Sequence, residues 1–410
     1  MTHPPQPVRT VLCACLAAVA LTAAAPGAGA PDRLIRLDGR LTEADVASID
    51  ADGRVHLAKD DTAVDLDALR RIDRPSVKRA ETKPDACDVF LTGGGRLRAA
   101  AVTFDGKVFA VDWAHGKGLR LPLETVRAVR LGTLPAKEKP AGPPAFASAR
   151  QKAETARDEL FAVVDGRIQV VRGALLAVEP DGVRFVWNDK ERRVAADKVY
   201  GIVLARRGPA LDRTGRCLID LADGSSVWMA VRGLEGGRLS GDLAGGGQLA
   251  VPWDAVARLR VRSTRMAFLS DLDPVEVREE ALVTYAGPWR RDRSVTGGPL
   301  TLGGRVYEKG LGVHSRCRLV YDVGGRYDVF AATIGIDAGA AGRGDCVFRV
   351  EADGKERFKR RVRGEDPPHV VRLAIPGARR LALEVTWGED LDLADRADWC
   401  DARVLKDDTN

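Results

Sequence analysis

The sequence predicts an all-β protein that contains more than one domain. Segments of strand length, in which hydrophobic and polar residues alternate, follow one another from about residue 32 towards the C-terminus. Turns rich in Gly and Asp separate these segments, as tight hairpins require. A chain of 410 residues is too long for one hydrophobic core, because domains have a typical size of roughly 150 residues. We therefore expect two or three domains.

Acidic and basic residues are interleaved along most of the chain. The formal net charge is +6, and 30% of the residues are charged. Proteins that bind nucleic acid concentrate Lys and Arg on one face. Here the densest basic run, residues 355–363, is interrupted by Glu356 and by hydrophobic residues. The pattern indicates a solvated surface, and we expect no nucleic-acid partner.

The first thirty residues have the pattern of a secretory signal peptide. A short polar segment ends at Arg9, an apolar run covers residues 11–25, and residues 28–30 supply an A-x-A cleavage site. The apolar run is too short and too rich in Ala for a membrane span. We therefore expect residues 1–30 to be removed on export. The mature protein would be secreted, periplasmic or part of the cell envelope, with no transmembrane segment.

Five cysteines remain after the expected cleavage. They are Cys87, Cys217, Cys317, Cys346 and Cys400. No C-x-x-C pair occurs, so a zinc site or a thioredoxin-like motif has no support. The odd number implies at least one thiol without an intramolecular partner. Two interpretations stay open, namely one disulfide among the last three cysteines, or buried cysteines that act as small hydrophobic residues.

A short phrase recurs four times between residues 32 and 261. Each copy has an acid two residues before an aliphatic residue, and a second aliphatic residue three positions further on. The acids are Asp67, Glu124, Asp197 and Asp254, and the later aliphatic residues are Ile72, Val129, Ile202 and Leu259. We interpret each phrase as a strand end, an acid that caps a single helical turn, and a final strand. Residues that recur once per unit belong to the scaffold, so these acids are predicted to contribute to stability alone.

The spacing of the four acids divides this region into two pairs of units. In its rhythm of strands and turns, each unit of about 45 residues resembles small SH3-like or Sm-like barrels. We expect one pair at residues 31–131, a linker rich in Pro and Ala at residues 132–157, and a second pair at residues 158–265. The units would act as spacers or contact protein partners.

No catalytic motif is recognisable. The chain lacks G-x-S-x-G, H-E-x-x-H, P-loop and dinucleotide-binding fingerprints in a suitable context. His56, His115 and His369 have no ligand-like neighbours in the sequence. We therefore expect a protein that is not an enzyme.

The last third of the chain carries several multi-residue motifs in a defined order. They are Trp-Arg-Arg-Asp-Arg-Ser-Val at residues 289–295, Gly-Gly-Pro-Leu at 297–300, Tyr-Glu-Lys-Gly-Leu-Gly-Val-His-Ser at 307–315, Leu-Val-Tyr-Asp-Val at 319–323 and Asp-Arg-Ala-Asp-Trp-Cys-Asp-Ala-Arg at 395–403. In order and spacing, residues 267–407 closely resemble the NPCBM family of carbohydrate-binding modules, which also occur beside glycoside hydrolases. The resemblance implies a galactose-binding-like jelly-roll β-sandwich, and the strand-length segments agree with two antiparallel sheets.

Carbohydrate binding requires aromatic faces for the sugar ring and a few fixed polar groups for its hydroxyls. The residues expected to supply them are Trp289, Arg291, Asp292, Tyr307, His314, Asp337 and Trp399, with Trp387 and Glu389 as further candidates. Two of these have an alternative structural interpretation. His314 would be a buried, hydrogen-bonded core residue, and Trp399 would pack against the sheet.

Sandwiches of this class often hold a structural calcium ion, which needs several oxygen ligands. Asp271, Asp398 and Asp401 lie near the two ends of the module, where an ion would clasp the termini. Two positions depart from the family pattern. Ala338 stands where a second acid is expected, which weakens a polar site at that loop, and Cys400 replaces a small apolar residue.

Together these observations predict an exported, non-catalytic protein that attaches to a glycan or polysaccharide, such as a galactose-like glycan, through its C-terminal sandwich. The alternative is a structural or adhesion scaffold of the cell envelope that binds protein partners, because one fold serves many ligands.

Overall fold

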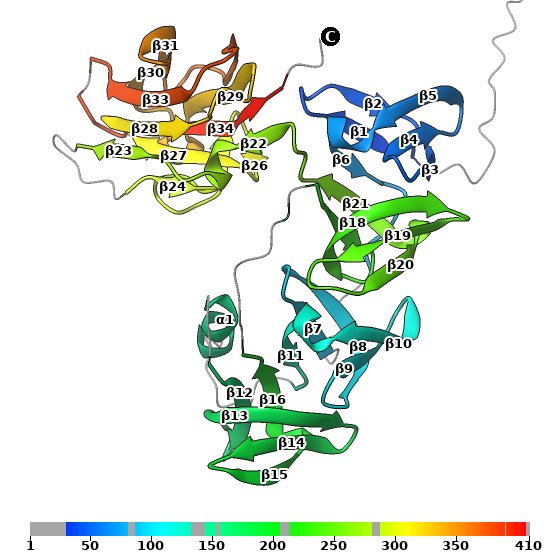
Figure 1. The fold of residues 1–410 in the computed structure, drawn as a ribbon. Helices are drawn as coiled ribbons and strands as arrows, with labels where there is room; N and C mark the ends of the chain where they lie inside the picture. The colour runs from blue at the N-terminus through cyan, green and yellow to red at the C-terminus, as the bar shows by residue number, and fades with distance from the viewer. Residues whose placement is uncertain are drawn as a thin grey trace, which may run out of the picture.

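The structure of the protein is a computed structural model. It describes residues 30–80, 87–132, 144–152, 156–205, 213, 215–280, 288–389 and 391–406. The expected signal peptide, apart from its last residue, lies outside this part of the chain. Strands hold 59% of the described residues and helices 7%, so the predicted all-β class is confirmed. Figure 1 shows a C-terminal sandwich beside four small β units, which we number 1 to 4 in sequence order.

Units 1 and 2 precede the linker. Unit 1 consists of β1 (Arg33–Arg36), β2 (Leu41–Glu43), β3 (Val46–Ile49), β4 (Arg54–Leu57), β5 (Asp60–Asp65), the 3-10 turn η1 (Leu66–Ala68) and β6 (Leu69–Asp73). Unit 2 consists of β7 (Cys87–Leu91), β8 (Gly95–Phe104), β9 (Val108–Trp113), β10 (Gly116–Pro122), η2 (Leu123–Thr125) and β11 (Val126–Arg130).

Units 3 and 4 follow the helix α1 (Pro144–Gln151). Unit 3 consists of β12 (Asp158–Val164), β13 (Arg167–Glu179), β14 (Gly182–Trp187), β15 (Lys190–Ala195), η3 (Ala196–Lys198) and β16 (Val199–Val203). Unit 4 consists of β17 (Cys217–Leu221), β18 (Ser226–Glu235), β19 (Arg238–Leu243), β20 (Gln248–Pro252), η4 (Trp253–Ala255) and β21 (Val256–Val261). In the described residues, no helix has the length and apolar character needed to cross a membrane.

Each unit closes in the same way, by pairing its last strand with its first. The pairs are β1 with β6, β7 with β11, β12 with β16 and β17 with β21. The predicted single helical turn precedes the last strand in every unit. The predicted capping role of the acid is wrong, because Asp67 lies inside η1 and the N-cap is Asp65, whose carboxylate accepts from the Asp67 N–H. The likeness of the units to SH3-like or Sm-like barrels stays a prediction.

The units pair in an order that differs from their order along the chain. β6 pairs with β21 through Ile72 and Leu259, and β11 pairs with β16 through Val129 and Ile202. β8 of unit 2 also pairs with β18 of unit 4. The spatial order is therefore 1, 4, 2, 3, as Figure 1 shows. The four aliphatic residues of the repeated phrase are buried at the junctions of unit 1 with unit 4 and of unit 2 with unit 3.

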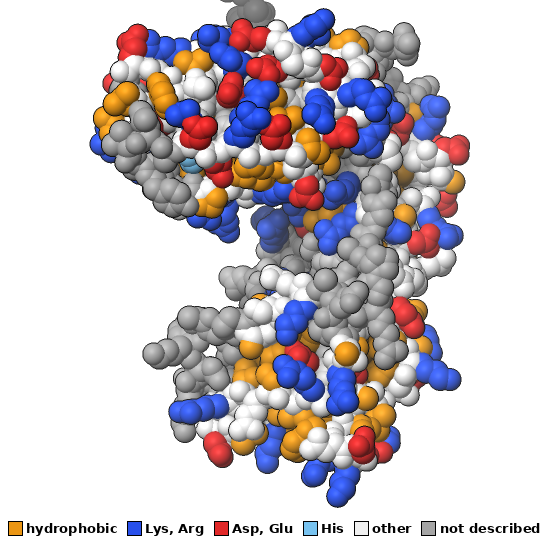
Figure 2. All heavy atoms as spheres, turned by 60° about the vertical axis from the view of Figure 1, so that its left-hand side comes forward, with side chains coloured by type: hydrophobic (Ala, Val, Ile, Leu, Met, Phe, Trp, Pro, Cys, Tyr) orange, Lys and Arg blue, Asp and Glu red, His pale blue; other side chains and the backbone are white. Residues whose placement is uncertain are grey.

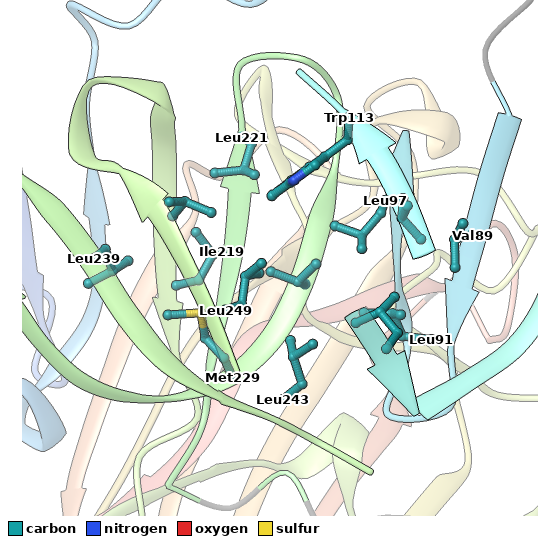
Figure 3. Packing of buried hydrophobic residues seen from close by; sticks show 14 of the residues in the cluster. Val89, Leu91, Leu97, Trp113, Ile219, Leu221, Met229, Leu239, Leu243 and Leu249 are labelled. Carbon is teal, nitrogen blue, oxygen red and sulfur yellow. The ribbon is translucent and has the colours of Figure 1, made fainter. Parts of the chain in front are cut away.

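One hydrophobic core runs through all four units. Figure 3 shows its passage from unit 2, with Leu97 and Trp113, to unit 4, with Ile219 and Leu221. Close approach at this junction requires glycine. Gly95 has a φ of +96°, and a Cβ there would lie 2.2 Å from the carbonyl oxygen of Ser226. The continuous core therefore packs the four units together as one body.

The sandwich begins after unit 4. Its elements are β22 (Met266–Phe268), η5 (Leu269–Asp271), β23 (Glu276–Glu279), β24 (Arg290–Arg291), β25 (Leu300–Leu302), β26 (Arg305–Tyr307), β27 (Gly310–His314), β28 (Cys317–Asp322), β29 (Val329–Ile336), η6 (Ala338–Ala340), β30 (Asp345–Ala352), β31 (Lys355–Arg363), β32 (His369–Ala374), β33 (Arg380–Trp387) and β34 (Arg396–Leu405).

Two antiparallel sheets face each other in the sandwich. One has the order β24-β27-β34-β29-β32, with β22 paired to β34, and the other has the order β23-β28-β33-β30-β31. Large apolar side chains, among them Tyr321, Phe330 and Phe348, fill the space between the sheets. The ribbon β25–β26 covers the outer face of β34, where Leu300, Leu302, Tyr307 and Cys400 form a separate small cluster. The predicted C-terminal β-sandwich is confirmed.

Buried and partly buried side chains join the sandwich to unit 1. Arg70 of β6 donates two hydrogen bonds to the Asp401 carboxylate, at 2.7 and 3.0 Å. Arg403 donates to the carbonyl oxygen of Leu37 at 3.2 Å. Asp67 accepts from the backbone N–H of Thr264 at 2.8 Å, directly before β22. The repeated acid of unit 1 therefore holds the segment that leads into the sandwich.

Candidate functional site

One end of the sandwich gathers aromatic and charged side chains from both sheets. β23 and β33 of one sheet end at Glu279 and Trp387, and Trp289 precedes β24 of the other. The chain crosses from β27 to β28 through a short connection at this same end. We name the following residues the sandwich-end cluster: Glu279, Trp289, His314, Arg316 and Trp387.

Glu279 links the members of this cluster that come from different sheets. Its Oε1 accepts a hydrogen bond from the backbone N–H of Trp289 at 2.7 Å and lies 3.5 Å from Nε2 of His314. Nδ1 of His314 lies 2.8 Å from the carbonyl oxygen of Ser315. His314 is 7% exposed, and the geometry favours its interpretation as a buried, hydrogen-bonded residue.

Arg316 occupies a strained backbone position within the cluster. Its φ is +59°, a left-handed conformation that costs a residue other than glycine about 1 kcal/mol. The guanidinium lies 4.8 Å from the ring centroid of Trp387 and forms an ion pair with Glu280. Backbone strain of this kind concentrates at functional sites. The tight connection between β27 and β28 therefore positions a cation beside an indole.

Both tryptophans of the cluster are partly exposed. Trp289 packs against the sandwich core, and the Arg291 guanidinium lies 5.1 Å from its ring centroid. Arg291 also donates to Asp273 at 2.8 Å. Each indole thus has an arginine within cation–π distance and a part that solvent can reach.

Asp292 points away from this cluster. It accepts from Nζ of Lys309 at 2.8 Å and from the backbone N–H of Gly310 at 3.1 Å. Asp271 is bound to the same ammonium at 2.6 Å. Burial opposes the charge of Lys309, but the two carboxylates outweigh it and raise the pKa of the ammonium. Asp292 therefore belongs to an ion-pair group beside β22 rather than to the sandwich-end cluster.

Three residues expected to contact a sugar lie in the interior. Trp399 is 1% exposed, and its ring centroid lies 5.0 Å from that of Phe348 and 6.3 Å from that of Phe330. Tyr307 and Asp337 are also buried, beside the ribbon β25–β26. The expectation of sugar contact is corrected for Trp399, because neighbouring aromatic rings enclose it on the core side of β34. Its alternative role, packing against the sheet, is the one that the structure supports.

Asp337 and Asp398 form a buried carboxyl pair beneath the ribbon. Asp337 accepts from the backbone N–H groups of Thr301 at 3.1 Å and Gly339 at 2.9 Å. Asp398 is fully buried, and within the described residues neither of its side-chain oxygens has a hydrogen-bond partner of normal geometry. Burial, followed by the charge of Asp337, raises the pKa of Asp398 to about 9. Asp398 is therefore a neutral acid at physiological pH.

The three acids expected to bind calcium do not meet. Asp271 is bound to Lys309, Asp401 is bound to Arg70, and Asp398 lies beneath the ribbon as a neutral acid. Calcium needs several ionised or carbonyl oxygens around one point. Across the described ranges, no group of three or more His, Cys, Asp or Glu side chains is arranged to hold a metal ion. The predicted calcium ligands do not fit the ion and are corrected.

The five cysteines of the described ranges form no disulfide with one another. Cys317 pairs with Val385 and Cys346 with Trp387 in one sheet, while Cys400 lies in the other sheet under the ribbon. Burial raises the pKa of Cys217 to about 12. Of the two interpretations left open by the sequence, the structure favours buried cysteines that act as small hydrophobic residues.

Sequence reasoning missed two members of the sandwich-end cluster. Glu279 lies ten residues before the nearest motif, which begins at Trp289, and its role depends on the meeting of β23 and β24. Arg316 follows the Val-His-Ser motif directly, and its place beside that motif was the available signal. Trp387 was a further candidate, and the structure brings it to Trp289's end of the sandwich. Glu389, the other further candidate, pairs with Arg361 at 2.6 Å.

Comparisons with known proteins agree on the C-terminal domain. A family profile described as the NPCBM/NEW2 domain matches residues 265–405. A protein of Renibacterium salmoninarum that is named an endo-alpha-N-acetylgalactosaminidase is 34% identical over 110 residues. That match covers 27% of this chain, and this chain spans 7% of the length of that protein.

Solved structures of carbohydrate-binding modules are also similar. The CBM51 module of GH95 from Clostridium perfringens, in complex with methyl-galactose, is 28% identical and covers 34% of this chain and 99% of its own, with a TM-score of 0.31. The tandem CBM51 modules of the family 98 glycoside hydrolase from Streptococcus pneumoniae are 14% identical, cover 92% of this chain and 88% of their own, and have a TM-score of 0.31. Residues 265–405 of this chain are therefore similar to the NPCBM/NEW2 domain family.

Proposed function

We propose that the protein is an exported, non-catalytic glycan-binding protein that uses the sandwich-end cluster as its sugar site. The observation that carries this proposal is the pair of partly exposed indoles, Trp289 and Trp387, at one end of a carbohydrate-binding module. An indole face stacks on the C–H surface of a sugar ring, and fixed polar groups beside it select the hydroxyls. The cluster supplies both.

The polar groups of the cluster are held before any ligand arrives. The backbone N–H of Trp289 donates a hydrogen bond to the Glu279 carboxylate. The guanidinium of Arg316 lies beside the Trp387 ring. Groups that are already ordered lose little conformational entropy on binding. Carboxylates and guanidinium groups form strong hydrogen bonds with hydroxyl groups. A galactose-like sugar is the first ligand that we would test.

The four units would carry the sandwich at one end of a continuous body. Strand pairing joins each unit to its spatial neighbour, and side chains of unit 1 hold the sandwich. A glycan bound at the sandwich end would therefore be held at a fixed position relative to all four units. Export through residues 1–30 is part of the proposal, and N-terminal sequencing of the protein recovered outside the cytoplasm tests it. A mature N-terminus near residue 31 would support cleavage, and an intact Met1 would contradict it.

A glycan array with the full chain, followed by calorimetry on each hit, tests the sugar site. We expect Trp289→Ala and Trp387→Ala each to weaken binding by about tenfold or more, because stacking on an indole is lost. Trp187→Ala is the matched control, since Trp187 is an indole of unit 3 that is 40% exposed. Its loss should leave binding unchanged. Binding that survives both sandwich-end changes, or a folded protein that recognises no glycan, would contradict the proposal.

A further inference from the structure

A cleft lies between the sandwich and units 1 and 4. Its volume is about 570 Å³. One wall comes from the end of β21 and the residues after it, including Arg262, and the opposite wall comes from η5, Lys309 and Arg326 of the sandwich. Figure 2 shows the surface hollowed below the sandwich, with Lys and Arg side chains gathered in the hollow. This cleft is separate from the sandwich-end cluster, since no member of the cluster lines it.

The lining of the cleft is strongly basic. Seven Lys or Arg side chains and three Asp or Glu side chains line it, an excess of four positive charges. Several of these cations already have carboxylate partners. The shortest ion-pair contacts are those of Arg70 with Asp401 at 2.7 Å, Arg71 with Asp73 at 2.9 Å, Arg260 with Asp220 at 2.9 Å, and Lys309 with Asp271 at 2.6 Å.

Arg262 and Arg326 differ from these cations. Neither has an ion-pair partner among the residues that the structure describes, although both line the cleft. Arg262 comes from the segment after β21 and Arg326 from the turn before β29, so the two charges come from opposite walls. Guanidinium groups bind carboxylate and sulfate oxygens in a bidentate manner. An anionic group in the cleft would supply the partner that the protein does not.

Aromatic surface lies beside these charges. Trp228 of β18 and Phe268 of β22 both line the cleft and are partly exposed. The Arg213 guanidinium lies 5.2 Å from the Trp228 ring centroid, and the Arg70 guanidinium lies 5.0 Å from that of Phe268. Apolar ring surface between cations suits a ligand that has a C–H face and carries negative charge. A saccharide with acidic substituents has this chemistry.

The two walls are held in place without a ligand. Asp67 binds Thr264 at one edge of the cleft, and Arg70 binds Asp401 at the base. A small apolar cluster that contains Leu37, Met266 and Leu405 closes the junction behind them. These contacts between the domains hold the two walls from which Arg262 and Arg326 come.

We infer that this cleft binds an anionic saccharide, with Arg262 and Arg326 as the residues that contact its carboxylate or sulfate groups. The inference deepens the proposed function and rests on it in one respect, namely that the ligand of the protein is a glycan. The sandwich end would recognise a neutral sugar, and the cleft would select chains that carry acidic substituents.

Calorimetry with the full chain tests the inference. The probes are polygalacturonate, which carries carboxylates, dextran sulfate, which carries sulfates, uncharged dextran, and double-stranded DNA. We expect binding to at least one acidic polysaccharide, none to uncharged dextran, and weaker binding as salt is raised, because screening reduces exposed charge interactions. Comparison of the first two probes identifies the anionic group. DNA that binds as tightly as the acidic polysaccharides would overturn the inference.

A double substitution, Arg262→Gln with Arg326→Gln, should weaken this binding by about tenfold or more. The matched control, Arg357→Gln with Arg360→Gln, removes two charges from exposed positions of β31 and should change affinity less than about twofold. Equal losses in both proteins would show general charge attraction and overturn the inference. A third protein, Arg262→Lys with Arg326→Lys, keeps both positive charges and should bind with intermediate affinity. Its retained binding would show that the Gln variant lost recognition of the anionic group and not its folded structure.

The tests distinguish the two proposals from each other. Trp289→Ala and Trp387→Ala should leave polygalacturonate or dextran sulfate binding in the cleft unchanged. If acidic polysaccharide binds through the cleft while no glycan needs the two tryptophans, the sandwich-end proposal fails and the cleft inference stands. If neutral glycans bind through the tryptophans and no acidic polymer binds, the cleft inference fails alone.

Discussion

The four units and the sandwich are joined to their neighbours by different means. Between units, backbone strands pair directly, and buried aliphatic residues such as Ile72 and Leu259 face each other across the junction. Between unit 1 and the sandwich, the contacts are made by side chains, chiefly the pair of Arg70 and Asp401 and the bond from Thr264 to Asp67. Strand pairing makes a continuous body, whereas side-chain contacts leave a cleft with charged walls. Both proposed binding sites are therefore on or beside the sandwich.

Loss of a junction side chain between units should have the largest effect. Leu259 is fully buried and pairs with Ile72, so we expect Leu259→Ala to lower the free energy of unfolding by about 2–5 kcal/mol. Urea denaturation of the full chain measures this free energy of unfolding. Leu41→Ala is the control, because Leu41 is 54% exposed and should cost less than about 0.5 kcal/mol. Equal effects of the two changes would mean that the junction contributes little.

The buried acid of the sandwich should make stability depend on pH. The pKa of Asp398 is about 9 in the folded protein, against 3.8 for an unperturbed aspartate, so between these values the folded state holds a proton that the unfolded state has lost. Stability from this group is complete below pH 3.8 and falls as pH rises towards 9, by at most about 1.4 kcal/mol per pH unit.

Asp398→Asn tests this dependence, because the amide cannot ionise. Unfolding of the sandwich followed from about pH 5 to about pH 8, within the window between the two pKa values, should show a smaller loss of stability in the variant than in the unchanged protein. The control is Asp322→Asn, a change at an exposed residue of β28, which should keep the original slope. Parallel slopes for all three proteins would disprove a neutral Asp398.

Removing the ion pair at the sandwich junction should have a moderate effect. Arg70 and Asp401 have side chains that are 18% and 12% exposed, so we expect Arg70→Ala to cost about 2 kcal/mol, less than a fully buried pair. Arg184→Ala removes an exposed pair with Glu191 and should cost below about 1 kcal/mol. Differential scanning calorimetry should show the Arg70 change in the transition that includes the sandwich. Identical unfolding of the two variants would contradict the larger contribution expected of the Arg70–Asp401 pair at the junction.

The smallest expected effect on stability comes from Arg316→Gly. Glycine adopts positive φ without strain, so relief of the backbone should offset the lost contacts and leave stability within about 1 kcal/mol of the original. Glycan affinity should still fall several-fold, because the cation beside Trp387 is lost. The relevant measurements are thermal unfolding and calorimetry on the same samples. Unchanged affinity would remove Arg316 from the proposed site.

The sequence predicted local structure better than it predicted contact between distant segments. The four recurring phrases located the 3-10 turns and the final strands, because turn chemistry and strand alternation act over a few residues. They did not indicate that β6 would pair with β21, since the partner of a strand edge is chosen by the whole fold. The basic run at residues 355–363 forms β31 at the edge of a sheet, where charged side chains discourage pairing with other chains.

Burial explains why some residues of the predicted sugar site come together in the structure whereas others lie in the interior. Trp289 and His314 come together as expected from a shared site, whereas Trp399 is enclosed. Residues of β34 are buried on both faces, because the core covers one face and the ribbon β25–β26 covers the other. Trp399 stands close to two aspartates and therefore looks exposed in the sequence, and only the packing of Phe330 and Phe348 on the core side of β34 shows that it is not. The same ribbon accounts for Cys400, which fills a small apolar gap beneath it.

The spatial order of the units constrains how the chain can fold as it is made. Arg258 of β21 bonds to Asp73 of β6 at 2.6 Å, and the two residues are 185 positions apart in the sequence. Unit 1 is synthesised first, yet the edge of β6 that faces away from β1 has no strand partner until unit 4 has been completed. Contacts between residues so far apart in the sequence form slowly. Until they form, the unpaired strand edge promotes aggregation. A chain that stops before residue 256 would leave the β6 edge open, so premature termination should yield aggregates rather than a shortened, soluble protein.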